Sequence, residues 1–416
     1  MTARDGKPDA GVVVVGGGAA GLMAAGCAGR RGRTVTVVER NPRMARKVLI
    51  TGKGRCNVTN HCTVEEAIAH VLGDGRFLYS AFSAFTPQDC MALFEELGVP
   101  LKTERGNRVF PVFDKAADIV DALVAYARTG GARFIQGRVT ELLIQDGICR
   151  GVVRDDGSVL KAEAVIVCTG GLSYPLTGST GDGYTLARQA GHTVTPLRPS
   201  LVPLEAEEAW CPKLQGLSLK NVGLTVWDTV MNKILYRDFG EMLFTHFGLS
   251  GPMVLSASAH LRQMEKGRYT VHIDLKPALT PEQLDARLLR DLKEEKNRTF
   301  GTLLNGLLPR SMVPILSELC GVPAERKCHS VTREERAALI RLLKDLPVRI
   351  AGYRPIEEAI VTAGGVSLRE INAKTMASKK TAGLYFAGEV LDLDAYTGGF
   401  NLQIAFATGQ AAGRAV

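Results

Sequence analysis

Short apolar runs and a small-residue helix alternate in the first forty residues. Residues 12–15 are four consecutive valines, a run that predicts a buried parallel strand. An Ala- and Gly-rich helix is expected next, running to about Arg31 and ending at Gly32. A second strand is predicted over residues 34–38. This β-α-β pattern is typical of a parallel sheet covered by helices.

Strand and helix patterns continue to alternate up to residue 192. A helix is predicted over residues 115–128, with Asp114 as its N-cap. Two Asp-Gly pairs, at 146–147 and 156–157, indicate tight hairpin turns and therefore a small β-meander. The meander leads into a further buried strand over residues 164–168.

The pattern changes after a group of prolines near residue 200, which indicates a domain boundary. Short strands dominate to residue 275, a helical pattern follows to 346, and an Ala- and Gly-rich helix ends the chain. We therefore predict an α/β nucleotide-binding domain that is split by an insertion. The predicted parts are residues 1–195 and 363–416 for the split domain, 196–278 with 347–362 for a β-rich substrate domain, and 279–346 for a small helical domain.

A glycine motif between the first strand and the first helix predicts a dinucleotide site. Gly16 allows the turn, Gly18 admits a pyrophosphate, and Gly21 lets helix and strand pack closely. The helix N-terminus then faces the phosphates. Glu39 ends the second strand, 21 residues after Gly18, where its carboxylate can accept hydrogen bonds from ribose hydroxyls.

Three later glycine motifs resemble the flavoproteins of the glutathione-reductase-like superfamily. They are residues 165–171, 384–389 and 398–403. The resemblance implies FAD, with Glu389 at the ribityl chain in a position that is usually Asp, shared with Asp392. The N-terminus of the last helix would face the flavin, where its positive end stabilises the anionic reduced form.

Residues 52–60, 245–252 and 361–366 resemble the BaiN/YhiN-type flavoproteins, a family often described as NAD(P)/FAD-dependent or aminoacetone-oxidase-like oxidoreductases. The resemblance implies a Rossmann-like FAD-binding domain interrupted by a β-barrel-like domain and a small helical domain. It also implies reduction of C4=C5 and C6=C7 double bonds in 3-oxo bile acids or steroids during 7-dehydroxylation. Amine oxidation is the alternative.

FAD is thus the expected cofactor. Because no second dinucleotide motif is present, either NAD(P)H visits the flavin directly as a transient reductant or a partner delivers the electrons. The predicted FAD contacts are Gly16, Gly18, Ala19, Ala20, Gly21, Glu39, Arg40, Lys47, Gly54, Arg55, Cys56, Asn57, Val139, Thr169, Gly170, Gly388, Glu389, Asp392, Gly399, Asn401, Leu402 and Gln403.

Several of these side chains allow a second interpretation. The loop around Arg55 either holds phosphate and carbonyl groups or is simply solvated. Cys56 is either a redox thiol or a packed cysteine. Candidate proton donors are His246, Tyr174 and Tyr396, each of which could instead be a packed or hydrogen-bonded structural side chain.

Composition narrows the class of protein. Glycine makes up 45 of 416 residues without any collagen period, and the predicted FAD segments concentrate it. No C-x-x-C pair exists, which argues against a disulfide reductase, and no cysteine or histidine group has a full metal-ligand spacing. Nine cysteines without a signal peptide favour a reduced, cytoplasmic protein, and no membrane span is expected.

The net charge of +8 keeps an RNA-modifying flavoprotein open as a lower alternative. No basic stripe with interleaved aromatic residues accompanies this charge, so no nucleic-acid partner is expected. The expected partner is a small apolar molecule that carries a carbonyl or an amine. The sequence does not indicate an oligomeric state.

Overall fold

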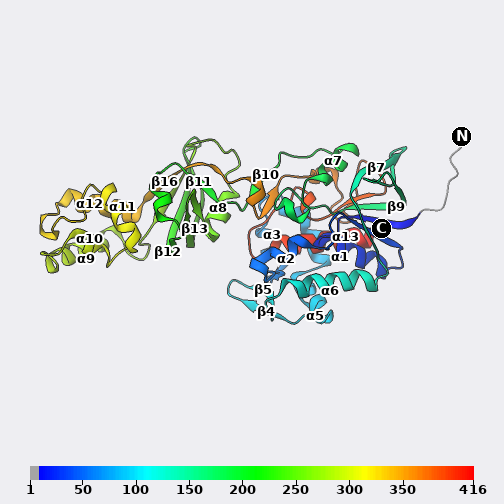
Figure 1. The fold of residues 1–416 in the computed structure, drawn as a ribbon, viewed down its shortest axis with the longest axis horizontal. Helices are drawn as coiled ribbons and strands as arrows, with labels where there is room; N and C mark the ends of the chain where they lie inside the picture. Colours follow the sequence, from blue (N-terminus) through cyan, green and yellow to red (C-terminus); the bar gives the residue numbers. More distant parts are fainter. Residues whose placement is uncertain (1–8) are drawn as a thin grey trace. The chain divides into compact units, whose positions relative to one another are not determined.

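The computed structural model describes residues 9–416, which form two compact units. Of the described residues, unit 1 contains 9–200 together with Ile356–Val416, and unit 2 is Leu201–Pro355. The chain therefore leaves unit 1 once and returns to it once. In Figure 1 the inserted segment is coloured from green through yellow to orange.

A mixed seven-stranded sheet forms the centre of unit 1. Its strands follow the order β6-β2-β1-β9-β8-β7, and β18 also pairs with β9. The pairs among β6, β2, β1, β9 and β18 are parallel, whereas β7, β8 and β9 form the antiparallel meander. The strands of this sheet are β1 (Ala10–Val15), β2 (Val35–Glu39), β6 (Arg133–Gln136), β7 (Val139–Gln145), β8 (Ile148–Arg154), β9 (Val159–Val167) and β18 (Leu384–Phe386).

The predicted β-α-β opening and the meander are confirmed. Every residue of β1 and β2 is buried, as expected for parallel strands covered on both faces. Two smaller sheets complete unit 1. They are β3 (Thr59–Asn60), β4 (Leu101–Glu104) and β5 (Arg108–Pro111) in one, and β10 (Arg198–Ser200) with β17 (Val361–Ala363) in the other.

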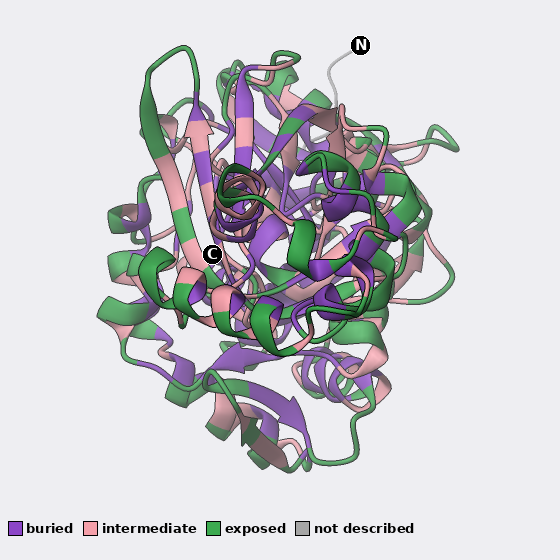
Figure 2. Cartoon of the chain, turned by 90° about the vertical axis from the view of Figure 1, so that its left-hand side faces the viewer, coloured by how far each residue is buried: buried purple, intermediate pink, exposed green. Residues whose placement is uncertain are grey.

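Helix α1 (Ala19–Arg30) packs between α6 (Ala116–Thr129) and α13 (Phe400–Ala415). Figure 1 shows α1 and α13 side by side, and Figure 2 shows buried residues on strands and inner helix faces. Small residues permit this contact. The remaining helices of unit 1 are α2 (Arg46–Ile50), α3 (Val64–Ala69), α4 (Tyr79–Ala84), α5 (Pro87–Glu96) and α7 (Asp182–Gln189).

The prediction that Asp114 caps α6 is wrong. The helix begins at Ala116, and its N-cap is Lys115, which makes no side-chain capping bond. Asp114 instead adopts a left-handed φ of 56° and bonds to Arg55 and Lys102. Ion pairs with side chains distant in sequence thus outcompete the local capping bond.

Unit 2 is built on a closed antiparallel barrel of six strands, in the order β11-β14-β13-β12-β15-β16. These strands are β11 (Leu204–Ala206), β12 (Ser218–Asp228), β13 (Lys233–Thr245), β14 (Gly248–Ser250), β15 (Tyr269–Asp274) and β16 (Leu346–Tyr353). The helices are α8 (Pro252–Ser258), α9 (Pro281–Glu294), α10 (Phe300–Leu304), α11 (Val313–Leu319) and α12 (Arg333–Lys344). Barrel and helices share one hydrophobic core, and the separation of residues 279–346 as a domain stays a prediction.

All nine cysteines are buried and free. Within residues 9–416, no helix has the length and apolar character needed to cross a membrane.

Candidate functional site

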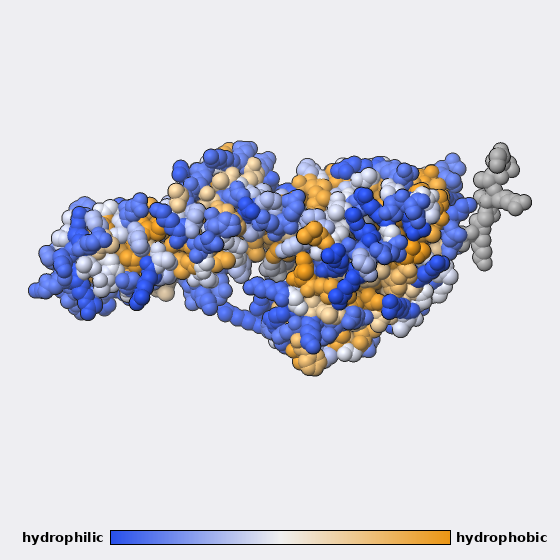
Figure 3. Space-filling view, in the orientation of Figure 1, coloured by the Kyte–Doolittle hydropathy of each residue, from blue (hydrophilic) through white to orange (hydrophobic). Residues whose placement is uncertain are grey.

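A cleft of about 1340 Å³, a volume that includes open solvent at its mouth, lies in unit 1 at the carboxyl ends of the parallel strands. The residues that follow β1, β2, β9 and β18 all line it. Ligands bind at this edge in open parallel α/β sheets, because the strand ends and helix N-termini converge there. On the face of unit 1 that Figure 3 shows, hydrophobic residues gather in the region of α1 and α2.

The glycine turn between β1 and α1 leaves space for a ligand at Gly18 and allows close packing of the backbone at Gly21. A Cβ on Gly18 would meet no atom within 4 Å, so this part of the cleft is open. A Cβ on Gly21 would collide with the carbonyl oxygen of Gly16. Gly18 is the N-cap of α1, with no side-chain cap and no acidic residue in the first turn. The first N–H groups of this helix are therefore available to an anion.

Glu39 is buried at the end of β2, and its carboxylate is held firmly. One oxygen accepts a hydrogen bond from the Gly17 N–H at 2.7 Å, and the other accepts two from Asn41 at 2.8 Å each. These bonds fix the carboxylate at the cleft wall, where its remaining lone pairs can accept from hydroxyl groups.

Two arginines that line the cleft bond to the carboxylate of Asp182. Arg138 donates two hydrogen bonds of 2.8 Å to Asp182, and Arg40 reaches the same carboxylate at 3.3 Å. Burial alone would raise the pKa of Asp182, but the bonds from Arg138 and the charge of Arg40 lower it. All three residues line the cleft, and they keep Asp182 ionised.

Helix α13 points its N-terminus toward the cleft, which Asn401 and Leu402 line. Its N-cap is Gly399, which makes no side-chain capping bond. The polar side chains that follow the cap already form hydrogen bonds within the protein. The Asn401 amide bonds to Ala395 and to the carbonyl of Tyr396, and Gln403 is bonded to Thr59 and Phe85. The backbone amides of this helix, more than these side chains, are therefore the groups offered to a ligand.

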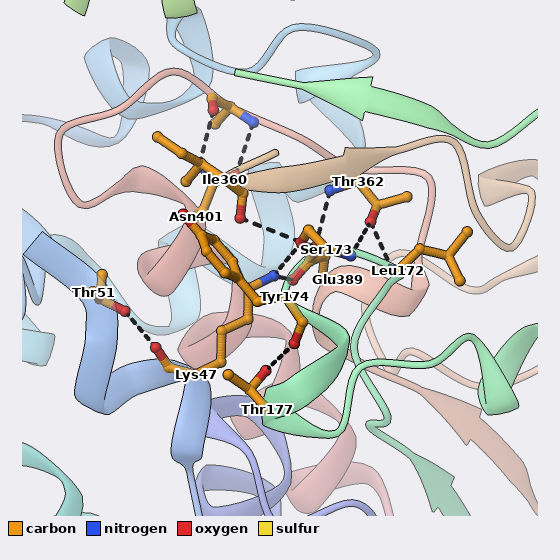
Figure 4. Close-up of polar contacts among 11 residues, drawn as sticks. Lys47, Thr51, Leu172, Ser173, Tyr174, Thr177, Ile360, Thr362, Glu389 and Asn401 are labelled. Atoms are coloured by element: carbon orange, nitrogen blue, oxygen red, sulfur yellow. Dashed lines mark hydrogen bonds and ion pairs between the residues drawn. The ribbon is translucent and has the colours of Figure 1, made fainter. Parts of the chain in front are cut away.

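A charged pair forms the polar wall of the cleft (Figure 4). Lys47 Nζ lies 2.6 Å from Glu389 Oε2 and 2.6 Å from Ser173 Oγ. Glu389 Oε1 also accepts from Ser173 Oγ at 3.0 Å and from the Thr362 N–H at 2.9 Å. Three separate segments of the chain thus meet at one carboxylate.

The donor set fits FAD. The uncapped N-terminus of α1, the open space at Gly18 and the Glu39 carboxylate match a pyrophosphate with an attached ribose, and the uncapped N-terminus of α13 offers amides to the flavin end. The hydroxyl of Thr169 is buried at the cleft and has no hydrogen-bond partner among the described residues. Because protein atoms already cover this oxygen, and a Cβ on Gly183 would collide with it, it takes no part in the fit to FAD.

The structure brings most predicted FAD contacts to the cleft wall. Those that line it are Gly16, Gly18, Ala19, Ala20, Glu39, Arg40, Lys47, Val139, Thr169, Gly170, Gly388, Glu389, Asn401 and Leu402. The others lie elsewhere in unit 1. They are Gly21, Gly54, Arg55, Cys56, Asn57, Asp392, Gly399 and Gln403.

The loop around Arg55 makes contacts away from the cleft wall. The Arg55 guanidinium bonds to Glu104 and Asp114 and lies over the Phe110 ring, 4.2 Å from its centroid. Hydrogen bonds to Glu104 and then Asp114 raise the pKa of Arg55. The sequence suggested a phosphate ligand, but in the described structure carboxylates satisfy this cation.

Cys56 and Asn57 are both buried beside that loop. Burial raises the pKa of the Cys56 thiol to about 12, which keeps it protonated and weakly reactive. Asn57 is 9% exposed, and its Oδ1 has no hydrogen-bond partner among the described residues. Asp392, a further predicted contact, accepts a hydrogen bond of 2.9 Å from Thr195.

The three candidate proton donors have different surroundings. Tyr174 has a left-handed φ of 52° and follows Ser173, and burial and then the charge of Glu358 raise its pKa. Tyr396 packs edge-on against His70 in unit 1. His246 is exposed in unit 2, on the turn between β13 and β14, with its ring against Phe247.

Some residues that line the cleft or support its wall have no signal in the sequence. Ser173 and Thr362 meet only through the fold, as do Arg138 and Asp182. Asn41 carries the clearest local signal, because an amide two residues after the strand-end Glu39 can bond back to it. Among residues 9–416, no group of three or more His, Cys, Asp or Glu residues is arranged to hold a metal ion.

Comparison with known proteins covers nearly the whole chain. Residues 10–415 match the family described as HI0933-like protein Rossmann domain. A 3-dehydro-bile acid delta(4,6)-reductase of Clostridium scindens is 32% identical over 408 residues, which cover 97% of this chain and 98% of that protein. A ribosomal RNA dihydrouridine synthase of Escherichia coli K12 is also 32% identical, over 398 residues and 95% of each chain.

A solved structure has a similar fold. The 3-ketosteroid-delta4-(5alpha)-dehydrogenase of Rhodococcus jostii RHA1, in complex with 4-androstene-3,17-dione, superposes with a TM-score of 0.54 at 16% identity. It covers 100% of this chain, which in turn covers 98% of it. The predicted fold class is confirmed as a mixed α/β, Rossmann-type FAD-binding fold with an inserted closed barrel and helices.

Proposed function

The chain belongs to the HI0933-like Rossmann family, the BaiN/YhiN type, and on that premise we propose that it is an FAD-dependent reductase. The proposed reaction is reduction of a C=C bond conjugated to a carbonyl, with NAD(P)H as the electron source. The observation that carries this proposal is the unit 1 cleft, where two uncapped helix N-termini and Glu39 match a bound dinucleotide.

The names of the relatives support one common chemical step. A delta(4,6)-reductase reduces carbon–carbon double bonds, and dihydrouridine is uridine with two added hydrogens. In uracil, the double bond that gains these hydrogens is conjugated to a carbonyl, as it is in a 3-oxo-Δ4,6 steroid. A flavoprotein oxidoreductase is therefore the coarse function that family and fold support.

In the proposed complex, FAD supplies hydride transfer between NAD(P)H and the conjugated double bond. The first N–H groups of α1 bind the pyrophosphate, and Glu39 accepts from the ribose hydroxyls. The α13 amides present the positive end of a helix to the negative charge of a reduced flavin. Val48 and Leu402 contribute apolar surface to the cleft wall.

Tyr174 is the proposed proton donor in unit 1. Hydride addition to the carbon distal to the carbonyl leaves negative charge that a proton on the neighbouring carbon must neutralise. A tyrosine hydroxyl carries a proton at neutral pH because its ordinary pKa is about 10, and burial raises the pKa of Tyr174 further. Its strained backbone and its place next to Ser173 favour a functional role. His246 and Tyr396 stay alternative donors.

We propose a small apolar 3-oxo-Δ4,6 steroid or bile acid as the substrate. A uracil base in RNA is the second candidate, because the dihydrouridine synthase matches at the same identity and the chain carries a net charge of +8.

Anaerobic stopped-flow spectroscopy tests the proposal. NADH or NADPH should bleach the flavin absorbance of the purified protein, and a 3-oxo-Δ4,6 steroid should restore it. Restoration by a uridine-containing RNA alone would favour the second candidate. Bleaching by amines and not by either nicotinamide would instead contradict the reductase and support an amine oxidase.

A further inference from the structure

The cleft contains one ion pair whose two members come from distant parts of unit 1. Lys47 belongs to α2, and Glu389 follows β18. Their charged atoms lie 2.6 Å apart, both residues line the cleft, and both side chains are mostly buried, at 25% and 18% exposure. A pair this shielded from solvent retains a large part of its electrostatic effect on its surroundings.

Counting the hydrogen bonds shows that the pair is asymmetric. The Glu389 carboxylate accepts bonds from Lys47, Ser173 and the Thr362 N–H. The Lys47 ammonium has three N–H donors and uses two, on Glu389 and Ser173. Its third N–H has no partner among the residues that the structure describes. The carboxylate is thus bound to the protein, whereas the ammonium keeps one donor for a group in the cleft.

The surrounding bonds hold this geometry in place. Ser173 is fully buried, and its hydroxyl lies 3.3 Å from the carbonyl of Ile360. The Thr362 hydroxyl accepts from the N–H groups of Leu172 and Ser173, at 2.8 and 3.2 Å. Figure 4 shows these segments converging on Glu389. Neither charge can therefore move far when the charge of a ligand changes.

We infer that Lys47 and Glu389 act as an opposed charge pair that sets the reduction potential of the bound flavin. This inference rests on the proposed FAD binding. The Lys47 ammonium stabilises negative charge in the cleft, and the Glu389 carboxylate partly cancels that effect. The two residues therefore shift the potential in opposite directions.

The charge balance of flavin reduction explains in which direction each residue shifts the reduction potential. Uptake of two electrons and one proton by neutral oxidised flavin leaves one negative charge on the reduced form. A nearby cation favours the reduced form and raises the potential, and a nearby anion lowers it. In the experiment below, a reducing dye system supplies both electrons.

The test is the midpoint potential of the FAD-loaded protein, measured against reference dyes. Lys47→Met should lower the potential and Glu389→Gln should raise it, each by at least a tenfold change in the oxidised-to-reduced ratio. For a two-electron couple, tenfold corresponds to about 30 mV. The double variant Lys47→Met with Glu389→Gln should lie between the two single variants.

Two further variants separate this role from a structural one. Lys161→Met removes an exposed lysine of β9 that does not line the cleft, and it should leave the potential unchanged. Lys47→Arg keeps the positive charge, so its oxidised-to-reduced ratio should stay within threefold of that of the unaltered protein. This variant also provides a test if Lys47→Met folds poorly. FAD affinity, measured by flavin fluorescence, and the Tm report on folding and binding independently.

The outcomes separate the two proposals. Shifts of the same sign in Lys47→Met and Glu389→Gln, or no shift beyond that of Lys161→Met, would overturn the charge pair. A protein that binds no FAD at all would contradict the proposed function instead. Structural damage alone would lower the Tm and the FAD affinity of both variants without moving their potentials in opposite directions.

Discussion

Gly18 and Gly21 lie three residues apart, yet a side chain would meet different surroundings at each position. Gly18 faces open cleft and has an ordinary φ of −83°, so its small size serves a ligand. Gly21 packs against the Gly16 carbonyl, so its small size serves the fold. One glycine motif thus combines a binding requirement with a packing requirement.

Gly18→Val separates these two requirements. The added side chain enters empty space, so the free energy of unfolding without FAD should fall by only about 1 kcal/mol, the cost of valine at an N-cap position. FAD affinity should fall at least tenfold, about 1.4 kcal/mol, because the side chain occupies the pyrophosphate position. Flavin fluorescence titration and thermal unfolding measure the two effects. Gly21→Ala, in contrast, should lower the Tm. If Gly18→Val bound FAD with unaltered affinity, the dinucleotide would have to bind elsewhere.

Among the elements, α13 combines a role at the cleft with a role in packing. Its N-terminus lies at the cleft, and its body packs against α1 so closely that Gly409 touches the Ala20 backbone. The Ala- and Gly-rich composition is therefore a packing requirement as well as a feature of the cofactor motif. Moving the helix outward would also move its N-terminal amides.

Gly409→Ala should destabilise unit 1. Its Cβ would collide with the Ala20 carbonyl, and overpacking of this kind costs about 1–3 kcal/mol. The Tm should fall by about 2–4 °C for each kcal/mol. Gly73→Ala is the matched control, because Gly73 is exposed and its Cβ would meet no atom within 4 Å. Equal Tm values for the two variants would contradict this close contact.

A polar cluster links the segment after α7 to the segment before β18. Glu370 accepts bonds from Thr193 and pairs with Lys380 at 2.8 Å, and His192 bonds to Glu370 and Ser378. Burial acts to raise the pKa of Glu370, but the bonds from Lys380 and Thr193 outweigh it and lower the pKa to about 2.

This cluster predicts a pH-dependent stability. A carboxyl group with a lowered pKa stabilises the fold above its unfolded pKa of about 4.3 and loses that contribution as the pH falls toward 2. Glu370→Gln should therefore cost on the order of 1 kcal/mol at pH 7 and progressively less below pH 4. Urea unfolding at pH 7, 4 and 3 measures the difference. A cost that stays constant across this range would exclude the ionised carboxylate as its origin.

At the scale of the whole molecule, the insertion begins and ends at one place in unit 1. Strands β10 and β17 pair antiparallel, with Ser200 opposite Val361. The two ends of the inserted segment therefore leave from neighbouring strands. Each unit also has its own hydrophobic core.

A shortened chain should therefore retain the cofactor site. Joining Ser200 to Ile356 by a short Gly-Ser linker removes unit 2 and leaves the β10–β17 pair intact. The product should unfold cooperatively and bind FAD at close to one per chain, as measured by thermal unfolding and flavin absorbance. Residues 201–355 alone should fold and bind none. Loss of FAD from a folded shortened chain would show that the cleft needs unit 2.

The sequence by itself determined the first β-α-β unit, the meander, the closing helix and the dinucleotide motif. Each depends on contacts within about thirty residues, where side-chain period, turn residues and glycines act directly on the local backbone. Gly16, Gly18 and Glu39 could be predicted for this reason. The family motifs extended the prediction to Thr169 and Gly388, which also line the cleft.

Only the tertiary structure decided how the distant polar groups pair. Asp114, expected as a helix cap, bonds to Arg55, and Arg55 in turn is not free for phosphate. Lys47 meets Glu389 across more than three hundred residues of sequence. Partners of this kind depend on which strand ends converge, and a charged side chain in a sequence carries no record of where its counter-ion lies.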